Sequence, residues 1–261
     1  MTIDVSGCRA KIERTRELRD ALEAVIPSSE DAATPRLPLG AKLERASGYY
    51  VFRVADVPED FYLRIGVIVG EAVHNLRTAL DHLFWQVASH HIGEAIPPKR
   101  VEEIKFPIES TSLGFSEEKM RVPEIPSGTW AVIEGAQAYN GRELLELLRV
   151  LSDDDKHGVI KPLLMSAKAG RIIYTANLPD GTNIEWDNTQ AEMYLKVGAE
   201  VTRIKFIPFS PYDEEEVEVA AHITPYIQLP KGDRPVVLGL HDMILEVEKV
   251  IDDLAMHIQE T

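Results

Sequence analysis

The sequence predicts an α+β fold, in which a helical part comes first, an antiparallel sheet follows and a last helix closes the chain. Three observations support this class. Before residue 165 most apolar residues recur at helical spacing, after it short stretches rich in Val, Ile and Tyr alternate apolar with polar residues, and residues 237–258 are again helical in period. Segregated helices and strands are typical of α+β proteins, whereas α/β proteins alternate them.

Helices are expected in the first part of the chain wherever apolar residues repeat every three or four positions. Pro27 ends the first helix, because proline cannot continue one. Ser127 is the expected N-cap of the third, since its hydroxyl accepts from free backbone N–H groups. The expected helices cover 7–26, about 60–91, 127–139 and 141–157.

Extended segments are expected at "GYYVFRVADV" (48–57), as a strand or an extended arm, and at "IKFPIES" (104–110). Past residue 165 the pattern predicts four or five antiparallel strands, with the hairpin turn signal "PDGTN" (179–183) between the first two. The strand-like stretches are "GRIIYTANL", "NIEWDN", "AEMYLKVGAEVTRIKFIPF" and "EEVEVAAHITPYIQL". We therefore divide the chain into a helical part (1–165) that carries the candidate site and a sheet with the C-terminal helix (166–261), unless the two form one continuous domain.

Length and composition fit a globular protein. The chain has 261 residues, 44% hydrophobic and 27% charged, which suits one large domain or two small ones. No window of 18 apolar residues predicts a membrane span, and the N-terminus has no apolar segment of the signal-peptide kind. Cys8 is the single cysteine, which excludes an internal disulfide and a zinc site built from cysteines. We expect a cytoplasmic protein with no membrane partner.

The charge distribution argues against a uniformly basic nucleic-acid binder, because the formal net charge is −15. The charge is uneven, however. Residues 9–19 contain five basic and two acidic side chains, so this predicted helix has a local positive charge.

The helix over 60–91 carries the candidate site, because it places several costly polar groups in an apolar helix. At 100° per residue, His74, Arg77 and Asp81 fall opposite the expected core stripe. The core stripe consists of Val69, Val73, Leu76, Leu80, Leu83 and Val87. A third ridge consists of Asn75, Thr78 and His82. Since Val67 and Trp85 lie on the far side as well, we expect this helix to be covered on more than one face.

The residues alone leave two interpretations of the polar cluster open. One is an internal ion-pair network, in which Arg77 pairs with Asp81 and a histidine caps the pair. The other is a polar site in an apolar surround, where pKa values are readily tuned. Arg77 and His82 lie about 140° apart around the helix, so the two are not expected to serve one site within a single chain.

A later segment, "LSDDDKHGVIKP", is expected to pack near this helix. It places three aspartates, Lys156 and His157 at the end of a Leu-rich helix. Aspartates at a helix C-terminus oppose the helix dipole, each by some tenths of a kcal/mol, which suggests that something other than helix stability placed them there.

Two resemblances follow from these residues. "HNLRTALDHLFW" and "LLRVLSDDDKHG" together resemble a group of uncharacterised, mainly actinobacterial proteins with an "HNLRSALDH"-type helix and a later "DKHR"-type segment, where Gly158 replaces the usual Arg. The Arg77-x4-His82 spacing is similar to the R-x4–6-H motif of HEPN-domain ribonucleases. In that family the motif residues of two protomers meet in a dimer cleft and cleave RNA without a metal. HEPN domains are small and all-helical and carry the motif on a late helix, and this chain departs from both features.

The HEPN resemblance implies a metal-independent endoribonuclease that acts as a homodimer on RNA and needs no cofactor. His74 or His82 would be the general base, and Arg77 would stabilise the charge of the transition state. Lys156 or the basic stretch 9–19 would hold the RNA backbone. Asp81 and His157 complete this candidate set.

Two alternatives come from other classes. A metal-dependent hydrolase would use His74, Asp81, Asp155 and His157 as ligands of Zn²⁺, Mn²⁺ or Fe²⁺. A non-catalytic interaction protein would use the same polar residues as a structural network or a dimer seam. Readings as a P-loop, dinucleotide-binding or α/β-hydrolase protein have no support, because their glycine and serine motifs are missing from the sequence.

Overall fold

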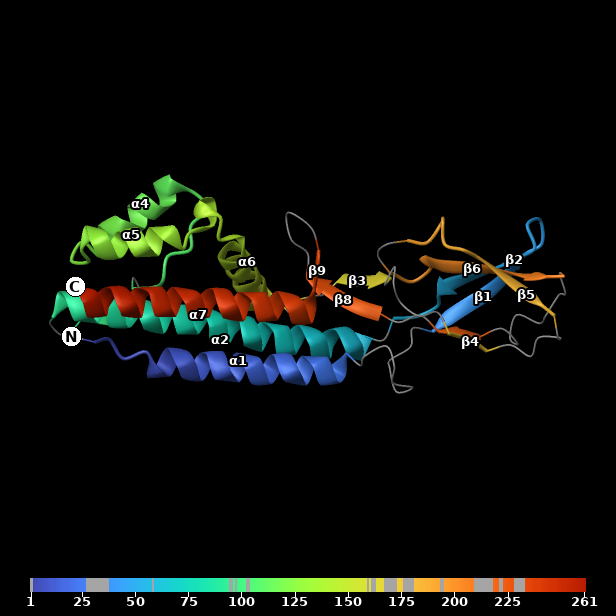
Figure 1. Cartoon of the computed structure of the whole chain (residues 1–261), viewed down its shortest axis with the longest axis horizontal. Helices are drawn as coiled ribbons and strands as arrows, with labels where there is room; N and C mark the ends of the chain where they lie inside the picture. Colours follow the sequence, from blue (N-terminus) through green and yellow to red (C-terminus); the bar gives the residue numbers. More distant parts are fainter. Residues whose placement is uncertain are drawn as a thin grey trace. The chain divides into compact units, whose positions relative to one another are not determined.

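The fold of this chain, in a computed structural model, is mixed α+β as expected: helices, an antiparallel four-stranded sheet and a C-terminal helix (Figure 1). The structure describes residues 2–26, 38–57, 59–93, 96, 98–101, 104–158, 160, 163–166, 173–175, 181–192, 195–208, 218–220, 223–227 and 233–261. None of the helices among these residues has the length and apolarity that a membrane crossing requires.

Contacts divide the chain into two units. The helical unit comprises Met1–Leu22, Ile65–Ile160 and Val237–Thr261, and the strand unit comprises Glu23–Arg64 and Lys161–Val236. From the sequence we divide the chain at residue 165 and group the last helix with the sheet, whereas the contacts group that helix with the N-terminal helices. The sequence does not decide this grouping, because an amphipathic helix can bury its apolar stripe against a sheet or against other helices.

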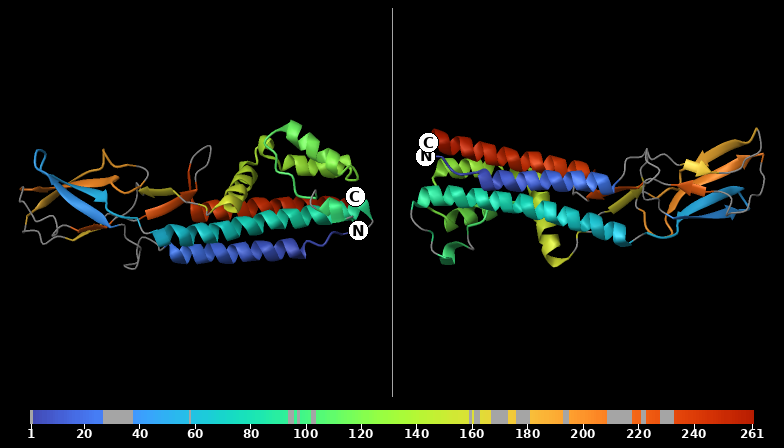
Figure 2. Two further views of the ribbon diagram at one scale, coloured as in Figure 1. Left: turned by 180° about the vertical axis from the view of Figure 1, so that it is seen from behind. Right: turned by 90° about the horizontal axis from the view of Figure 1, so that it is seen from below.

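Three long helices form the frame of the helical unit: α1 (Ser6–Val25), α2 (Glu59–Ile92) and α7 (Val236–Glu260). Figure 2 shows all three lying side by side in both views. The predicted core stripe of α2 is confirmed, since each of its six residues is fully buried. The apolar face predicted for α7 is likewise buried along Leu240, Met243, Ile244, Val247, Val250 and Leu254. Val67, by contrast, is 52% exposed, so the far side of α2 is open to solvent at that point.

Cys8 lies in the core of this frame, on α1. Its side chain is 1% exposed, and burial raises the pKa of the thiol to about 11. The thiol is therefore protonated at neutral pH and unsuited to act as a nucleophile.

Shorter helices complete the helical unit: α3 (Pro98–Val101), α4 (Ser112–Arg121), α5 (Ser127–Gly135), a 3₁₀ turn η1 (Ala138–Asn140) and α6 (Glu143–His157). The expected N-cap at Ser127 is wrong by one residue, because Pro126 is the cap and forms no side-chain bond. Helix α4 is not predicted from the sequence. Thr111 caps it by accepting from the Gly114 N–H at 3.2 Å.

The strand unit contains a four-stranded antiparallel sheet in the order β1-β2-β6-β5. Its strands are β1 (Leu39–Glu44), β2 (Tyr49–Val54), β6 (Glu200–Ile207) and β5 (Asn183–Asp187). Leu39–Glu44 is not among the expected strands, but it forms a strand that pairs with β2 across a turn where Gly48 has φ 76°. That conformation favours glycine, which has no Cβ to clash. One apolar cluster of this sheet contains Tyr50, Phe52, Ile204 and Phe206.

Two smaller sheets among the described residues lie in the same unit. β3 (Leu163–Ser166), β8 (Ile223–Ile227) and β9 (Arg234–Pro235) form one sheet, and β4 (Ile173–Thr175) pairs with β7 (Glu218–Ala220). The hairpin expected across 179–183 is wrong, because β4 pairs with β7 and β5 pairs with β6. Pro179 and Asp180 of that turn signal lie outside the described residues.

Candidate functional site

Arg77 and Asp81 of α2 bind the backbone of the extended segment 104–109. Arg77 Nη2 donates to the carbonyl oxygen of Phe106 at 2.7 Å, and the Phe106 N–H donates to Asp81 Oδ1 at 2.9 Å. The two side chains also pair with each other, with 3.1 Å between Arg77 Nη2 and Asp81 Oδ1. Both backbone groups of Phe106 are thus bound by charged side chains, much as a neighbouring strand would bind them.

Gln137 binds the same segment a second time. The Glu109 N–H donates to Gln137 Oε1 at 2.7 Å, and Gln137 Nε2 donates to the carbonyl oxygen of Pro107 at 3.0 Å and to that of Ile133 at 2.9 Å. Gln137 is fully buried, so these bonds satisfy an amide that water does not reach. We call Arg77, Asp81 and Gln137 the segment clamp.

The segment clamp places the Phe106 ring in the core. Phe106 is fully buried, and its ring meets that of Phe84 edge-on with 6.3 Å between the centroids. Phe84 in turn contacts Trp130 of α5 at 5.7 Å. The polar groups on the far side of α2 therefore have a packing consequence, because they fix an aromatic side chain against the helix.

The two candidate histidines of α2 face other neighbours. His74 is exposed, and its Nε2 lies 3.5 Å from Thr78 Oγ1 on the same helix. His82 lies beside α1, where a Cβ added to Gly7 would be 3.5 Å from His82 Nδ1. Arg77 reaches Phe106 while His82 lies against α1, so the two residues of the R-x4-H spacing face different elements.

The aspartates at the end of α6 are partly compensated within the helix. Lys156 Nζ donates to Asp153 Oδ1 at 3.0 Å, and Arg149 Nη1 lies 3.5 Å from Asp153 Oδ2. The bond from Lys156, together with the charges of Arg149 and Arg77, holds the pKa of the Asp153 carboxyl below its usual value. The influence of Arg77 on Asp153 shows that the end of α6 lies within electrostatic reach of the segment clamp.

The end of α6 also touches α2 directly. A Cβ added to Gly70 would overlap the carboxylate of Asp155, so the absence of a side chain at Gly70 lets this acid approach α2 one turn before His74. Lys156 and His157 are exposed. The structure therefore brings Arg77 and Asp81 together, brings Asp153 and Asp155 near α2, and leaves His157 at the surface.

The basic stretch of α1 is bound to its neighbours. Each of its five basic side chains bonds or contacts a residue of α2 or α7. The partners are Asp252 for Arg9, Asn75 for Lys11, Glu71 for Arg14, Glu248 for Arg16 and His241 for Arg19. This positive charge is used between helices, which leaves less of it for phosphate groups.

The metal-ligand set expected as an alternative is not assembled. Within the ranges that the structure describes, no three or more His, Cys, Asp or Glu side chains are grouped closely enough to hold a metal ion. His74, Asp81, Asp155 and His157 all belong to those ranges. Asp81 is instead bonded to Arg77 and to the backbone N–H of Phe106.

Sequence reasoning missed Gln137, and it also missed a histidine group at the far end of α2. The rings of His90 and His91 lie 4.9 Å apart, and Thr129 Oγ1 lies 3.3 Å from His91 Nε2. A Cβ on Gly128 would lie 3.7 Å from Cε1 of His257. The adjacent His90 and His91, just before the glycine that follows α2, could have indicated the histidine group. A single glutamine between two alanines gives no such indication for Gln137.

Folding stability of the helical unit is expected to fall as the pH drops from about 7.5 to about 5.5, in part through His91. Burial, followed by the charges of His90 and His257, lowers the pKa of His91 from its ordinary value of 6.5. The folded chain thus binds this proton more weakly than the unfolded chain. The stability that neutral His91 contributes is therefore present above the pKa of the unfolded chain, and it is lost as the pH falls toward the lower pKa of the folded chain. In thermal unfolding, the Tm of His91→Gln should fall less over this pH range than the Tm of the wild type.

A His74→Gln variant is the matched control, because it removes an exposed imidazole from the same helix. It should keep the wild-type change of Tm with pH. An identical pH dependence in His91→Gln and wild type would contradict the assignment to His91.

Comparisons with protein-family models, with curated proteins and with solved structures gave no match to this chain. Its function therefore has to be argued from the contacts of its own residues.

Proposed function

We propose that this chain is a non-catalytic interaction protein, and that the polar residues of α2 stabilise its helical unit. The observation that supports this most is the bonding of Phe106 by Arg77 and Asp81, at 2.7 Å and 2.9 Å. A catalytic arginine or carboxylate has to reach a substrate. These two groups already bind a backbone segment that a substrate would have to displace.

The main alternative is the ribonuclease suggested by the Arg77–His82 spacing. It requires the arginine of one protomer to meet the histidine of another, together with a positive surface for the phosphates. The pairing of the α1 cations with α2 and α7 favours the non-catalytic proposal over this one.

Single-stranded RNA incubated with the purified protein in EDTA discriminates the two. The proposal expects the RNA to remain intact, and His74→Ala and His82→Ala variants to behave like the wild type. Cleavage that disappears in either histidine variant would overturn the proposal and establish the ribonuclease. Cleavage of equal rate in all three proteins would identify a contaminating nuclease, which a further purification step then removes before the assay is repeated.

Elemental analysis of the same untreated sample addresses the hydrolase alternative. The proposal expects less than about a tenth of an equivalent of zinc, manganese or iron per chain. A full equivalent that is lost in Asp81→Asn would support the hydrolase instead.

A further inference from the structure

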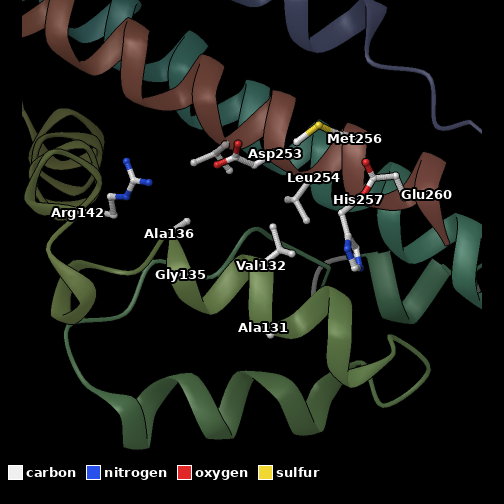
Figure 3. Close-up of a pocket in the computed structure, with 11 residues that line it drawn as sticks. Ala131, Val132, Gly135, Ala136, Arg142, Asp253, Leu254, Met256, His257 and Glu260 are labelled. Carbon is white, nitrogen blue, oxygen red and sulfur yellow. The ribbon is translucent and has the colours of Figure 1, made fainter.

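A pocket of about 390 Å³ lies between α5 and α7 (Figure 3). Its volume falls within the range of roughly 300–1,000 Å³ that is usual for small-molecule sites. Figure 3 shows Val132 and Leu254 facing each other across it. The other apolar or small residues that line it are Ala131, Gly135, Ala136, Val250 and Met256. The wall is thus partly apolar, and polar side chains make up the rest of it.

Negative charge lies along the α7 side of this pocket. Glu246, Asp253 and Glu260 are seven residues apart, which places them on one ridge of the helix. Arg142 neutralises the first of them, with 2.8 Å between Arg142 Nη1 and Glu246 Oε1. Among the described residues, neither Asp253 nor Glu260 has an ion-pair partner, although both line the pocket. The pocket therefore combines apolar side chains with two carboxylates that have no ion-pair partner among the described residues, and Arg142 and His257 are the basic side chains of its lining.

We propose that this pocket binds a small organic cation, whose ammonium group pairs with Asp253 and whose apolar body lies on Val132. Asp253 is half-buried and Glu260 is exposed, so the charge of Asp253 is the less screened by water. The inference rests on the proposed function as a non-catalytic interaction protein and adds a ligand class to it.

Titration with three ligands of similar size and different charge tests the proposal: 2-phenylethylammonium, 2-phenylethanol and 3-phenylpropionate. Amide chemical shifts of Val132, Asp253 and Leu254 report the binding. The ammonium ligand should shift these amides and bind at least about fivefold more tightly than the alcohol, as one partly screened ion pair predicts. The carboxylate ligand should bind most weakly. Equal affinities for cation and alcohol, or no shift at these amides at millimolar ligand, would overturn the proposal.

Two variants locate the charge. Asp253→Asn should reduce the ammonium ligand to the affinity of the alcohol. Asp252→Asn removes the same charge one residue earlier, where the carboxylate pairs with Arg9 of α1, and should retain the preference for the cation. A preference that survives in Asp253→Asn would contradict the proposed pairing.

Ala131→Phe tests the location, because this exposed residue lines the pocket and a phenyl group would fill it. It should abolish binding of all three ligands while the Tm shows that the protein remains folded; undiminished binding would overturn the assignment to this pocket.

The RNA assay keeps the two proposals separable. Intact RNA without ligand binding rejects only the ligand class, whereas histidine-dependent cleavage rejects the non-catalytic function.

Discussion

A Gln137→Met variant is expected to lose about 2–4 kcal/mol of folding stability. Methionine keeps the length of the side chain but neither accepts from the Glu109 N–H nor donates to the Pro107 carbonyl. Each buried backbone group left without a partner costs about 1–3 kcal/mol. Loss of the bond to the Ile133 carbonyl costs less, because that oxygen also accepts from the Ala136 N–H at 3.1 Å. Urea unfolding followed by the circular dichroism of the helices measures the change.

Asn140→Ala provides the matched control. Asn140 is an exposed amide that donates to the Glu134 carbonyl at 2.7 Å, so its loss should cost about 1 kcal/mol or less. Equal losses in the two variants would contradict the role given to Gln137, because burial would then make no difference.

An Arg77→Met variant is expected to lose about 1.5–3 kcal/mol, the range for hydrogen bonds that involve a charged group. The methionine retains most of the apolar stem of the arginine, so the loss reports the missing bonds to Phe106 and Asp81 more than a cavity. The Arg77 side chain is 20% exposed, which limits the ability of water to replace those bonds. The same urea experiment measures the change.

Arg14→Met is the control for Arg77→Met. Arg14 also pairs with a residue of α2, Glu71 at 2.8 Å, but its side chain is 48% exposed. An exposed pair of this kind contributes little to folding stability, because water and salt screen its charges. If Arg14→Met destabilised the protein as much as Arg77→Met, the distinction between a surface pair and the segment clamp would be lost.

Helical periodicity predicted the core faces of α2 and α7, because burial selects apolar residues at fixed spacing and that spacing is visible in one sequence. It did not predict which element each face packs against. Helix α7 packs with the N-terminal helices, and β1–β2 joins a sheet whose other strands come more than 100 residues later. Pairing over that separation depends on shape and register, which no local pattern records.

The division of the α2 polar residues into two ridges was also predictable, since it follows from 100° per residue. Arg77 and Asp81 bind Phe106, while the third ridge faces α1 through Asn75 and His82. The partners themselves were not predictable. Phe106 is 29 residues from Arg77, and Arg77 binds its backbone carbonyl. Any residue type offers the same carbonyl, so the sequence does not indicate this bond.

The central claim is that Arg77 and Asp81 bind the chain itself, and hydrogen exchange at the Phe106 amide tests it most directly. The bond from this N–H to Asp81 Oδ1 should protect the amide in the wild type. Asp81→Ala should accelerate its exchange by about tenfold or more, whereas His82→Ala, on the other ridge, should leave the rate unchanged. An unprotected Phe106 amide in the wild type, or one that exchanges equally fast in the wild type and in Asp81→Ala, would contradict the claim.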